Sequence, residues 1–379
     1  MNFGKNSTYF LAILGVIMAF SSATFAQSEP KAEARKYSNE FLKIGVGARA
    51  FGMGHAMIAT SDDVLSGYWN PAGLVNGSLK PEVSLMYASY FANVATYNYL
   101  GFALPLDSAG NRRFGVSLIR LGVDNIPNTL DLVSNGNLDF NKVKAFATSD
   151  FATLISYAWK PAAMPRLSFG TNFKIIYRGV GRFGNAWGFG LDLAAKYKTD
   201  RFAAGLMVTD ATQTYNMWTF NTETFGSTFI STGNVIPENS VEITRPTIRM
   251  GAAYNIIHSN SLGLLLAVDN DIYLDGKRSS AILTAGIASF DPRVGIEFSY
   301  KNKNTGKPIA FLRGGFYNLQ NTVNGNGDAV TGIFPTAGLG FVVKNFQVDY
   351  ALANIGNFQQ NLYSNVVSLK LIIPSKTNQ

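Results

Sequence analysis

The chain has 379 residues and a formal net charge of +8, with 13% aromatic residues and 37 glycines but only 15% charged residues. Soluble domains carry about 25% charged residues, so this composition disfavours an ordinary soluble protein. Cysteine is absent and the only histidines are His55 and His258, which excludes disulfides and thiol chemistry and disfavours a metal site or imidazole catalysis. The basic residues form no run of the kind that binds nucleic acid, and we expect no nucleic-acid partner.

The first 26 residues predict a secretory signal peptide. Lys5 provides a positive start, residues 11–20 form a short apolar run, and Thr24-Phe25-Ala26 ends in the small-x-small manner of a cleavage site. The apolar run is shorter than the roughly 20 residues that a membrane-spanning helix needs. We therefore expect cleavage after Ala26 and a mature chain that begins at Gln27.

Residues 27–81 do not alternate like the wall of a barrel. A Gly-rich run, residues 45–54, is followed by Asp62-Asp63 and by Trp69-Asn70-Pro71. A Gly-rich run binds phosphate where a strand leads into a helix within a βαβ unit, and nothing downstream predicts such a unit. We interpret the glycines as sites of close backbone packing, and Asp62-Asp63 as a solvated helix start capped by Ser61, because neighbouring carboxylates point apart.

From residue 82 onward apolar and polar residues alternate with a period of two, which is typical of strands that separate two environments. In residues 167–178 one face is apolar, while the other carries Ser168, Asn172, Lys174 and Arg178. These segments are longer than the strands of about 5–6 residues common in soluble sheets. The predicted strands cover residues 82–90, 96–105, 112–121, 150–159, 166–178, 185–198, 201–210, 243–255, 261–270, 281–300, 308–317, 333–343, 346–353 and 363–373.

The number of strands depends on residues 281–300, where Asp291-Pro292 could separate two strands. One strand gives 14 in total, the even number expected of a bacterial barrel, and places all long connections on one side. Two strands give 15 and move the last two long connections to the other side. We therefore predict an all-β transmembrane antiparallel β-barrel of about 14 strands. Its long outer connections cover residues 122–149, 211–242, 318–332 and 354–362.

Alternation assigns many charged side chains to the lumen, because a charge that faces lipid costs about 2–4 kcal/mol at the bilayer midplane. The predicted lumen-facing charges are Lys174, Arg178, Asp192, Lys196, Arg245, Arg249 and Arg293, with Glu297 and Lys370 beside them. Such an interior could favour anions, bind the acidic residues Glu40, Asp62 and Asp63, or be a wet lumen in which the charges satisfy one another.

We predict no catalytic residues, cofactor or metal. Asp269, Asp271 and Asp275 are spaced like part of a calcium loop, but the glycine and the final glutamate of such a loop are missing.

The words FLKIGVGARAFGMGHAMIATSDD and YWNPAGL, ahead of a barrel-like remainder, resemble the PorV/PorQ family of outer-membrane proteins. That family is related to FadL-type transporters of long-chain fatty acids. The resemblance implies a FadL-like barrel over residues 82–379 and a plug in the lumen, with a periplasmic lead, over residues 27–81. It places these residues in the plug motif: Gly45, Gly47, Arg49, Gly52, Met53, Gly54, Trp69, Asn70 and Pro71.

The resemblance also implies a non-enzymatic protein of the bacterial outer membrane that serves the type IX secretion system, either as a shuttle for secreted cargo or within a surface attachment complex. Gly73 and the absence of a terminal aromatic residue depart from the pattern and favour a paralogue. The expected partners are outer-membrane lipid and, through the connections 122–149 and 211–242, secretion-system proteins and cargo.

Two alternatives remain open at this stage. The chain could be a FadL-like transporter of hydrophobic compounds, which the charged interior disfavours, or a porin-like barrel, which a plug disfavours.

Overall fold

The computed structural model describes residues 38–90, 93–134, 137–276, 278, 281–323, 329–353 and 364–374. The predicted signal peptide and the lead up to residue 37 lie outside the described residues. Among the described residues, no helix is both long and apolar enough to cross a membrane.

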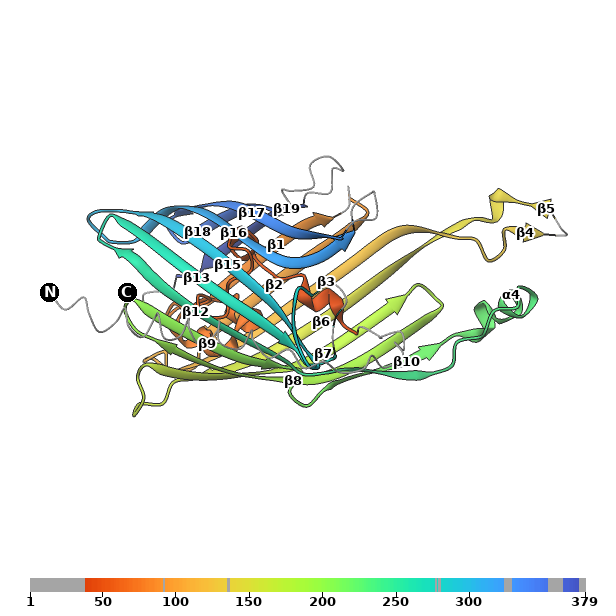
Figure 1. Ribbon diagram of the computed structural model, residues 1–379, viewed down its shortest axis with the longest axis horizontal. Helices are drawn as coiled ribbons and strands as arrows, with labels where there is room; N and C mark the ends of the chain where they lie inside the picture. Colours follow the sequence, from red (N-terminus) through yellow and green to blue (C-terminus); the bar gives the residue numbers. More distant parts are fainter. Residues whose placement is uncertain are drawn as a thin grey trace.

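The described strands form a closed antiparallel barrel with 14 staves, where a stave is one strand or two collinear strands that span the wall (Figure 1). The barrel closes where β1 pairs with β19, from Glu82 opposite Ile372 to Ser89 opposite Asn365. The staves are, in order, β1 (Glu82–Tyr90), β2 (Ala95–Pro105), β3 (Arg112–Asn128), β6 (Lys144–Trp159), β7 (Leu167–Val180), β8 (Gly184–Lys198), β9 (Phe202–Thr209) with β10 (Thr214–Phe220), β11 (Ser240–Thr244) with β12 (Thr247–His258), β13 (Leu262–Tyr273), β15 (Ala288–Lys301), β16 (Pro308–Val323), β17 (Ala329–Val343), β18 (Phe346–Ala353) and β19 (Ser364–Ile372).

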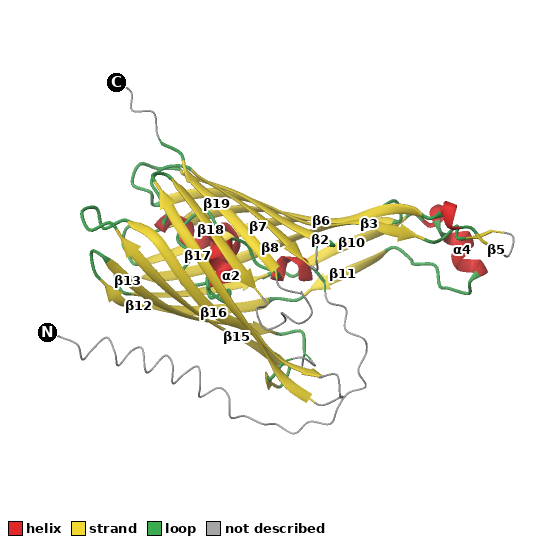
Figure 2. Cartoon of the chain, turned by 90° about the horizontal axis from the view of Figure 1, so that it is seen from above, coloured by secondary structure: helices red, strands yellow, loops and turns green. Residues whose placement is uncertain are grey.

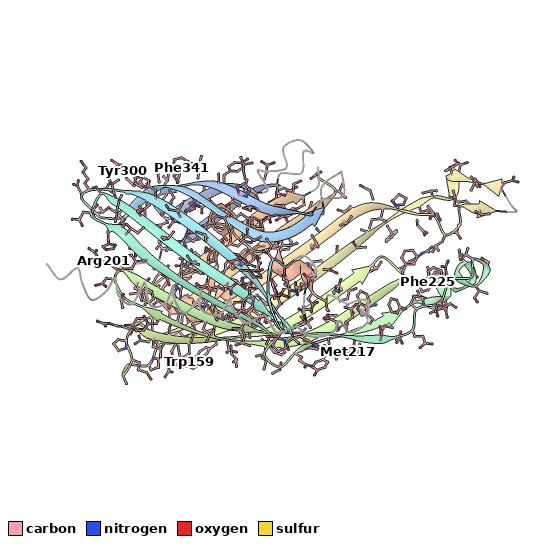
Figure 3. All side chains as sticks on the ribbon, viewed as in Figure 1. Trp159, Arg201, Met217, Phe225, Tyr300 and Phe341 are labelled. Carbon is pink, nitrogen blue, oxygen red and sulfur yellow. The ribbon has the colours of Figure 1, made fainter. Side chains whose placement is uncertain are left out.

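The alternation of side chains explains why these segments form a membrane wall. On β8 the outward residues Trp187, Phe189, Leu191 and Leu193 are exposed, and the residues between them are buried. Closure pairs the backbone groups of the wall, which lipid cannot hydrogen-bond. Figure 3 shows outward side chains along the whole barrel, with Tyr300 and Phe341 toward the end that lies opposite Phe225.

The prediction of 14 strands is confirmed, but the interpretation of residues 281–300 needs correction. This range contains β14 (Leu283–Ala285), a turn at Gly286, and all of β15 except its last residue. Pro292 does not end β15. It lies between the residues that pair with β14 (288–290) and those that pair with β16 (294–301), so its missing N–H is tolerated at an interval without a partner on that side.

The predicted connections 122–149 and 211–242 are also more ordered than expected. β3 and β6 continue as a paired hairpin to Asn128 opposite Lys144, and its tip holds β4 (Val133–Ser134), β5 (Asn137–Leu138) and η4 (Phe140–Lys142). The second connection contains β10, η5 (Thr222–Thr224), α4 (Gly226–Ser231) and β11. Both hairpins extend far beyond one end of the barrel (Figures 1 and 2), which is the end expected outside the cell.

In two neighbouring staves the side chains that face the lumen switch between odd-numbered and even-numbered residues near the middle of the stave. Odd residues such as Met207 are buried on β9, but Thr214 and Asn216 are buried on β10; likewise β12 buries Thr247, while β11 turns its even residues inward. Arg245 lies in the break between β11 and β12 and is exposed. The alternation that predicted a lumen position for Arg245 therefore does not hold there.

We predict that Leu191→Arg, on the outer face near the middle of β8, lowers the free energy of unfolding by about 2–4 kcal/mol, because the charge faces lipid. Met164→Arg, in the exposed turn between β6 and β7, is the matched control and should change it little. Urea unfolding in lipid vesicles measures both variants. Equal effects would contradict the assignment of the lipid-facing side.

Candidate functional site: a motif segment inside the barrel

The segment of residues 38–76 lies inside the barrel (Figure 2). It consists of η2 (Glu40–Lys43), α2 (Ala48–Gly52), α3 (Ser66–Trp69) and η3 (Pro71–Asn76), joined by turns. α2 contacts β16 to β19, and η3 contacts β3, β6, β7 and β8. The segment therefore bridges opposite sides of the lumen, and nearly all of residues 45–75 are buried.

Glycines let the backbone of the segment touch the backbone of the wall. Gly54 has a φ of +56°, and a Cβ there would lie 2.6 Å from backbone atoms of Phe316. Opposite it, a Cβ on Gly315 would lie 2.5 Å from the Gly54 nitrogen, and one on Gly52 would lie 3.0 Å from the Cα of Gly338. No side chain fits at these contacts, because real Cβ atoms do not approach backbone so closely. This explains the GMG word of the motif.

Arg49 anchors the same helix to the wall through a buried ion network. Its guanidinium donates to both Glu297 oxygens at 2.8 and 3.1 Å and to the Thr60 carbonyl at 3.2 Å. Glu297 also accepts from Arg313 at 2.7 Å, and Arg313 donates to Asp349 at 2.7 Å. The two-oxygen contact fixes the orientation of Arg49 as well as its position.

Asp62 and Asp63 bind lysines of the wall and do not form a solvated helix start. Asp62 accepts from Lys196 at 2.6 Å and Lys198 at 2.7 Å, and Asp63 accepts from Lys370 at 2.7 Å. The helix that follows begins later than predicted, at Ser66. Of the interpretations open for the basic interior, the structure therefore places Asp62 and Asp63 in ion pairs with it, whereas Glu40 pairs with Lys43 of its own helix.

The Trp69-Asn70-Pro71 word holds the second half of the segment. The Trp69 indole N–H donates to the Val46 carbonyl at 2.9 Å. The Asn70 side chain donates to the Ile58 carbonyl at 3.0 Å and accepts from the Ala72 N–H at 3.1 Å. Asn70 thus caps η3, whose first residue is Pro71. The motif residues Gly45 and Gly47 have positive φ angles of 97° and 86°, and Met53 is fully buried.

Apart from Arg245, the other predicted lumen charges are inward and paired. Lys174 bridges Asp192 (2.8 Å) and Asp210, and Arg249 and Arg293 share Asp271 at 3.0 and 2.7 Å. Arg178 lies between two acidic residues, at 3.2 Å from Asp150 and 3.3 Å from Glu242.

Asp269, Asp271 and Asp275, which are spaced like part of a calcium loop, each bind a different group. Asp269 accepts from the Ile58 N–H at 2.7 Å, Asp271 pairs with the arginines, and Asp275 pairs with Arg278 at 2.5 Å. Within the described ranges, no cluster of acidic residues or histidines fits a metal ion.

A cavity of about 290 Å³ lies between the segment and the staves β1, β13, β15 and β16. Aromatic and charged side chains line it together, among them Lys43, His55, Tyr273, Arg293 and Tyr317. The His55 ring stacks on Tyr317, with 4.4 Å between the ring centroids. Burial, with repulsion from Arg293 and Arg249, lowers the pKa of His55 well below its usual value of 6.5. His55 is therefore neutral, as expected of a packed residue.

A family model described as "Type IX secretion system protein PorV" matches residues 28–261. This match covers more than half of the chain. The chain belongs to the PorV family. The match includes the whole motif segment and the wall as far as the end of β12. No curated protein matches the sequence.

Solved structures of FadL-type barrels share the fold of this PorV-family protein. The toluene transporter TbuX of Ralstonia pickettii has 14% identity and a TM-score of 0.50, over 87% of this chain and 99% of that one. The monoaromatic hydrocarbon channel CymD has 11% identity and a TM-score of 0.51, over 87% and 98%. A FadL homologue of Pseudomonas aeruginosa has 11% identity and a TM-score of 0.50, over 85% and 97%. At such identities the likeness concerns the fold alone.

The family and the fold place this PorV-family chain in the outer membrane as a FadL-like barrel associated with type IX secretion. The families that it matches are secretion and transport proteins and not enzymes.

Sequence reasoning missed several charged wall residues. Lys198 and Glu242 contact the segment directly, through Asp62 and Ser38. Asp210, Arg313 and Asp349 belong to the ion pairs of the wall around it. For Arg313 a signal was available, since a charge within the apolar strand 308–317 must face the lumen. Asp210 offered none, because it lies in the break between β9 and β10.

We predict that Gly54→Ala loosens the segment while the barrel stays folded, because overpacking costs about 1–3 kcal/mol. The chain has no cysteine, so Ala59→Cys, a fully buried position, reports opening by its rate of maleimide labelling. We expect labelling to become about tenfold faster. Lowering the free energy that is needed to open the segment by about 1.4 kcal/mol makes the open form about ten times more populated. Gly226→Ala, which has room for a Cβ, is the control. Unchanged labelling in Gly54→Ala would refute the close-contact argument.

We also predict that acid releases the segment. Burial alone would raise the pKa of Asp62, but Lys196 and Lys198 lower it below the ordinary value of 3.8; Lys370 and Arg49 do the same for Asp63. A lowered pKa in the folded state means stability that is present above pH 3.8 and is lost as the pH falls through the folded value. The thiolate that reacts with maleimide is almost absent in acid, so the reagent here is dithiodipyridine, which still reacts with thiols at low pH. Compared with a free thiol at the same pH, labelling of Ala59→Cys should therefore accelerate only below pH 3.8.

The variant Asp62→Asn tests the same pairs at neutral pH. It leaves the buried Lys196 without a carboxylate, and breaking such a pair costs about 3–5 kcal/mol. Labelling at pH 7 should then be fast, whereas Glu223→Gln, an exposed control, should behave like the unaltered protein. If Ala59→Cys is still labelled slowly at pH 7 when Asp62→Asn is present, these ion pairs do not hold the segment.

Proposed function

We propose that this PorV-family protein receives secreted proteins at the outer face of the outer membrane through its two long hairpins, while residues 27–81 act as a plug that keeps the lumen closed. The proposal rests on one combination of features: the lumen is occupied, and the projecting hairpins expose apolar side chains. Among the described residues, the motif segment occupies the lumen between opposite staves, whereas the hairpins offer apolar surface outside the membrane.

Exposed apolar side chains at the hairpin tips support protein binding. Leu138 and Phe140 (71% exposed) lie at the tip of the β3–β6 hairpin, and Ile230 and Val235 (89% exposed) lie in the β10–β11 connection. Large exposed apolar residues gathered at one end of a molecule are typical of interaction sites.

A chain of aromatic contacts supports a common action of the hairpins. Phe146 of β6 meets Phe183 of the β7–β8 turn at 5.0 Å between ring centroids, Phe183 meets Phe225 at 6.3 Å, and Phe225 meets Phe229 of α4 at 4.9 Å. These contacts tie the β10–β11 connection to the base of the β3–β6 hairpin. A partner that binds one hairpin is therefore positioned against the other.

The plug part of the proposal rests on the interior contacts. Residues 38–76 touch opposite staves, their backbone meets wall glycines, and Arg49, Asp62 and Asp63 are ion-paired with the wall. The alternative of a transporter for hydrophobic compounds gains no such support. A path for apolar molecules needs an accessible apolar lining. The apolar residues on the inner face of the wall, such as Tyr97, Ile119 and Ile176, are buried against the motif segment, and paired charges line other parts of the lumen.

Deleting the hairpin tips, residues 129–143 together with 221–239, and joining the remaining strands by Asn-Gly turns is expected to abolish surface display of secreted proteins. The barrel should still fold, because its wall is untouched, and heat-modifiable migration on gels measures this. Replacing the short turn Asn302–Lys307 by Asn-Gly at the opposite end is the matched control. Normal surface display in the tip-deleted strain would refute the proposed function.

A further inference from the structure

β11 has a strand partner on one side only. It pairs with β10, from Thr244 opposite Thr214 to Ser240 opposite Trp218. Its continuation, β12, pairs with β9 on one side and β13 on the other. β13 ends at Tyr273, opposite Thr247, and does not reach β11. In the part of the chain that the structure describes, β11 therefore has one open strand edge. This edge faces the same way as the edge of β12 that pairs with β13.

The hydrogen-bond register identifies the backbone groups on this open edge. The Asn221 N–H donates to the Phe183 carbonyl at 2.8 Å, so odd residues of β10 point their backbone groups toward β8 and even residues point toward β11. The partners of the even residues are Ser240, Glu242 and Thr244. The N–H and C=O groups of Val241 and Ile243 consequently face the open edge.

This edge carries little of the usual protection. Proteins place proline, lysine or other charges on free edges to prevent pairing, and the projecting part of β3 contains Pro127 while that of β6 begins at Lys144. β11 contains neither proline nor lysine, and its one charge, Glu242, points inward and is paired with Arg178. The side chains beside its free groups are Val241 (58% exposed) and Ile243 (48% exposed). β11 lies in the hairpin that extends away from the barrel (Figure 2), where water can hydrogen-bond an unpaired edge.

The edge is held rigid from the inside of the barrel. Glu242 accepts from Ser38 at 3.1 Å and from Arg178 at 3.3 Å, and Thr244 accepts from Asn39 at 2.9 Å. The inward face of β11 is therefore engaged by the motif segment and by β7. A rigid edge binds an added strand with a smaller entropic cost than a mobile one.

A strand added to this edge would extend the line of β13 beyond Tyr273. Its outward side chains would lie beside Val241 and Ile243, which favours apolar residues there. Its inward side chains would lie beyond Tyr273, which lines the cavity of about 290 Å³ together with Arg278 and Asp291. This neighbourhood favours polar residues. The site thus fits an alternating strand and recognises it mainly through main-chain hydrogen bonds.

We propose that the open edge of β11 is the docking site at which this protein captures an extended β-strand of a secreted protein by strand addition. This inference rests on the proposed function and specifies how the partner is held: the hairpin tips make the first apolar contact, and the edge supplies the ladder.

Two prolines test the ladder directly. Val241→Pro with Ile243→Pro removes both free N–H groups and leaves the pairing with β10 intact, since the donors to β10 belong to the neighbouring residues. The matched control, Val241→Thr with Ile243→Thr, changes the same side chains and keeps the N–H groups. The probe is one purified secreted protein of the same organism that depends on the type IX secretion system, added to the full-length protein in lipid nanodiscs.

Strand addition predicts that the probe binds the unaltered protein and slows amide hydrogen exchange at residues 241 and 243. It also predicts that the double proline variant binds at least about tenfold more weakly, a loss of about 1.4 kcal/mol, while the double threonine variant binds normally. Heat-modifiable migration checks that all variants fold. The exchange measurement on the unaltered protein tests the inference even if the proline variant does not fold.

Other outcomes would overturn the inference. Normal binding by a folded proline variant, or exchange at residues 241 and 243 that the probe does not slow, would refute strand addition but leave the proposed function standing. Slow exchange at residues 241 and 243 without the probe would mean that the edge is already occupied. If deletion of residues 27–37 restores fast exchange, the occupant is the chain's own lead; if dilution restores it, the occupant is a second copy of the protein. Failure of the probe to bind even the unaltered protein would refute the proposed function and this inference together.

Discussion

The structure depends on one constraint: within lipid, each backbone N–H and C=O must find a partner in the protein. The pairing of β1 with β19 meets it by joining the two ends of the sheet. Only a closed ladder can span the membrane in this way. The outward apolar residues and the inward charges both follow from closure, because each strand then separates lipid from a protected interior.

Closure of 14 staves creates a lumen that side chains of the wall alone do not fill, and the motif segment occupies it. Its position is set by two kinds of contact that act together. Glycines on both sides let main chains touch, and ion pairs such as Arg49 with Glu297 and Asp62 with Lys196 fix the register. A buried ion pair adds little net stability, but the loss of one partner leaves a costly buried charge. The segment is thereby held in one arrangement.

The outer end of the barrel follows a different rule. Outside the membrane water can satisfy open edges, so the staves can end at different heights and the β3–β6 and β10–β11 hairpins can project. In the described part of the chain, the same freedom leaves β11 with one unpaired edge, because β13 ends at Tyr273. The closed wall, the occupied lumen and the projecting hairpins with the open edge of β11 together agree with the function that we propose for this protein of the type IX secretion system.

Much of this could be predicted from the sequence, because alternation and loop length are local properties. They determined the membrane barrel, its 14 strands, its outer side, and the inward charges such as Lys174 and Arg249, while the GMG and Trp-Asn-Pro words identified the family. Only the tertiary structure decided which charges pair, that the long connections continue as strands, and that Arg245 leaves the pattern. The physical reason is that breaks such as residues 210–213 depend on contacts between neighbouring staves, where the Asp210 N–H donates to Asp192 of β8. Alternation along one strand carries no information about its neighbours.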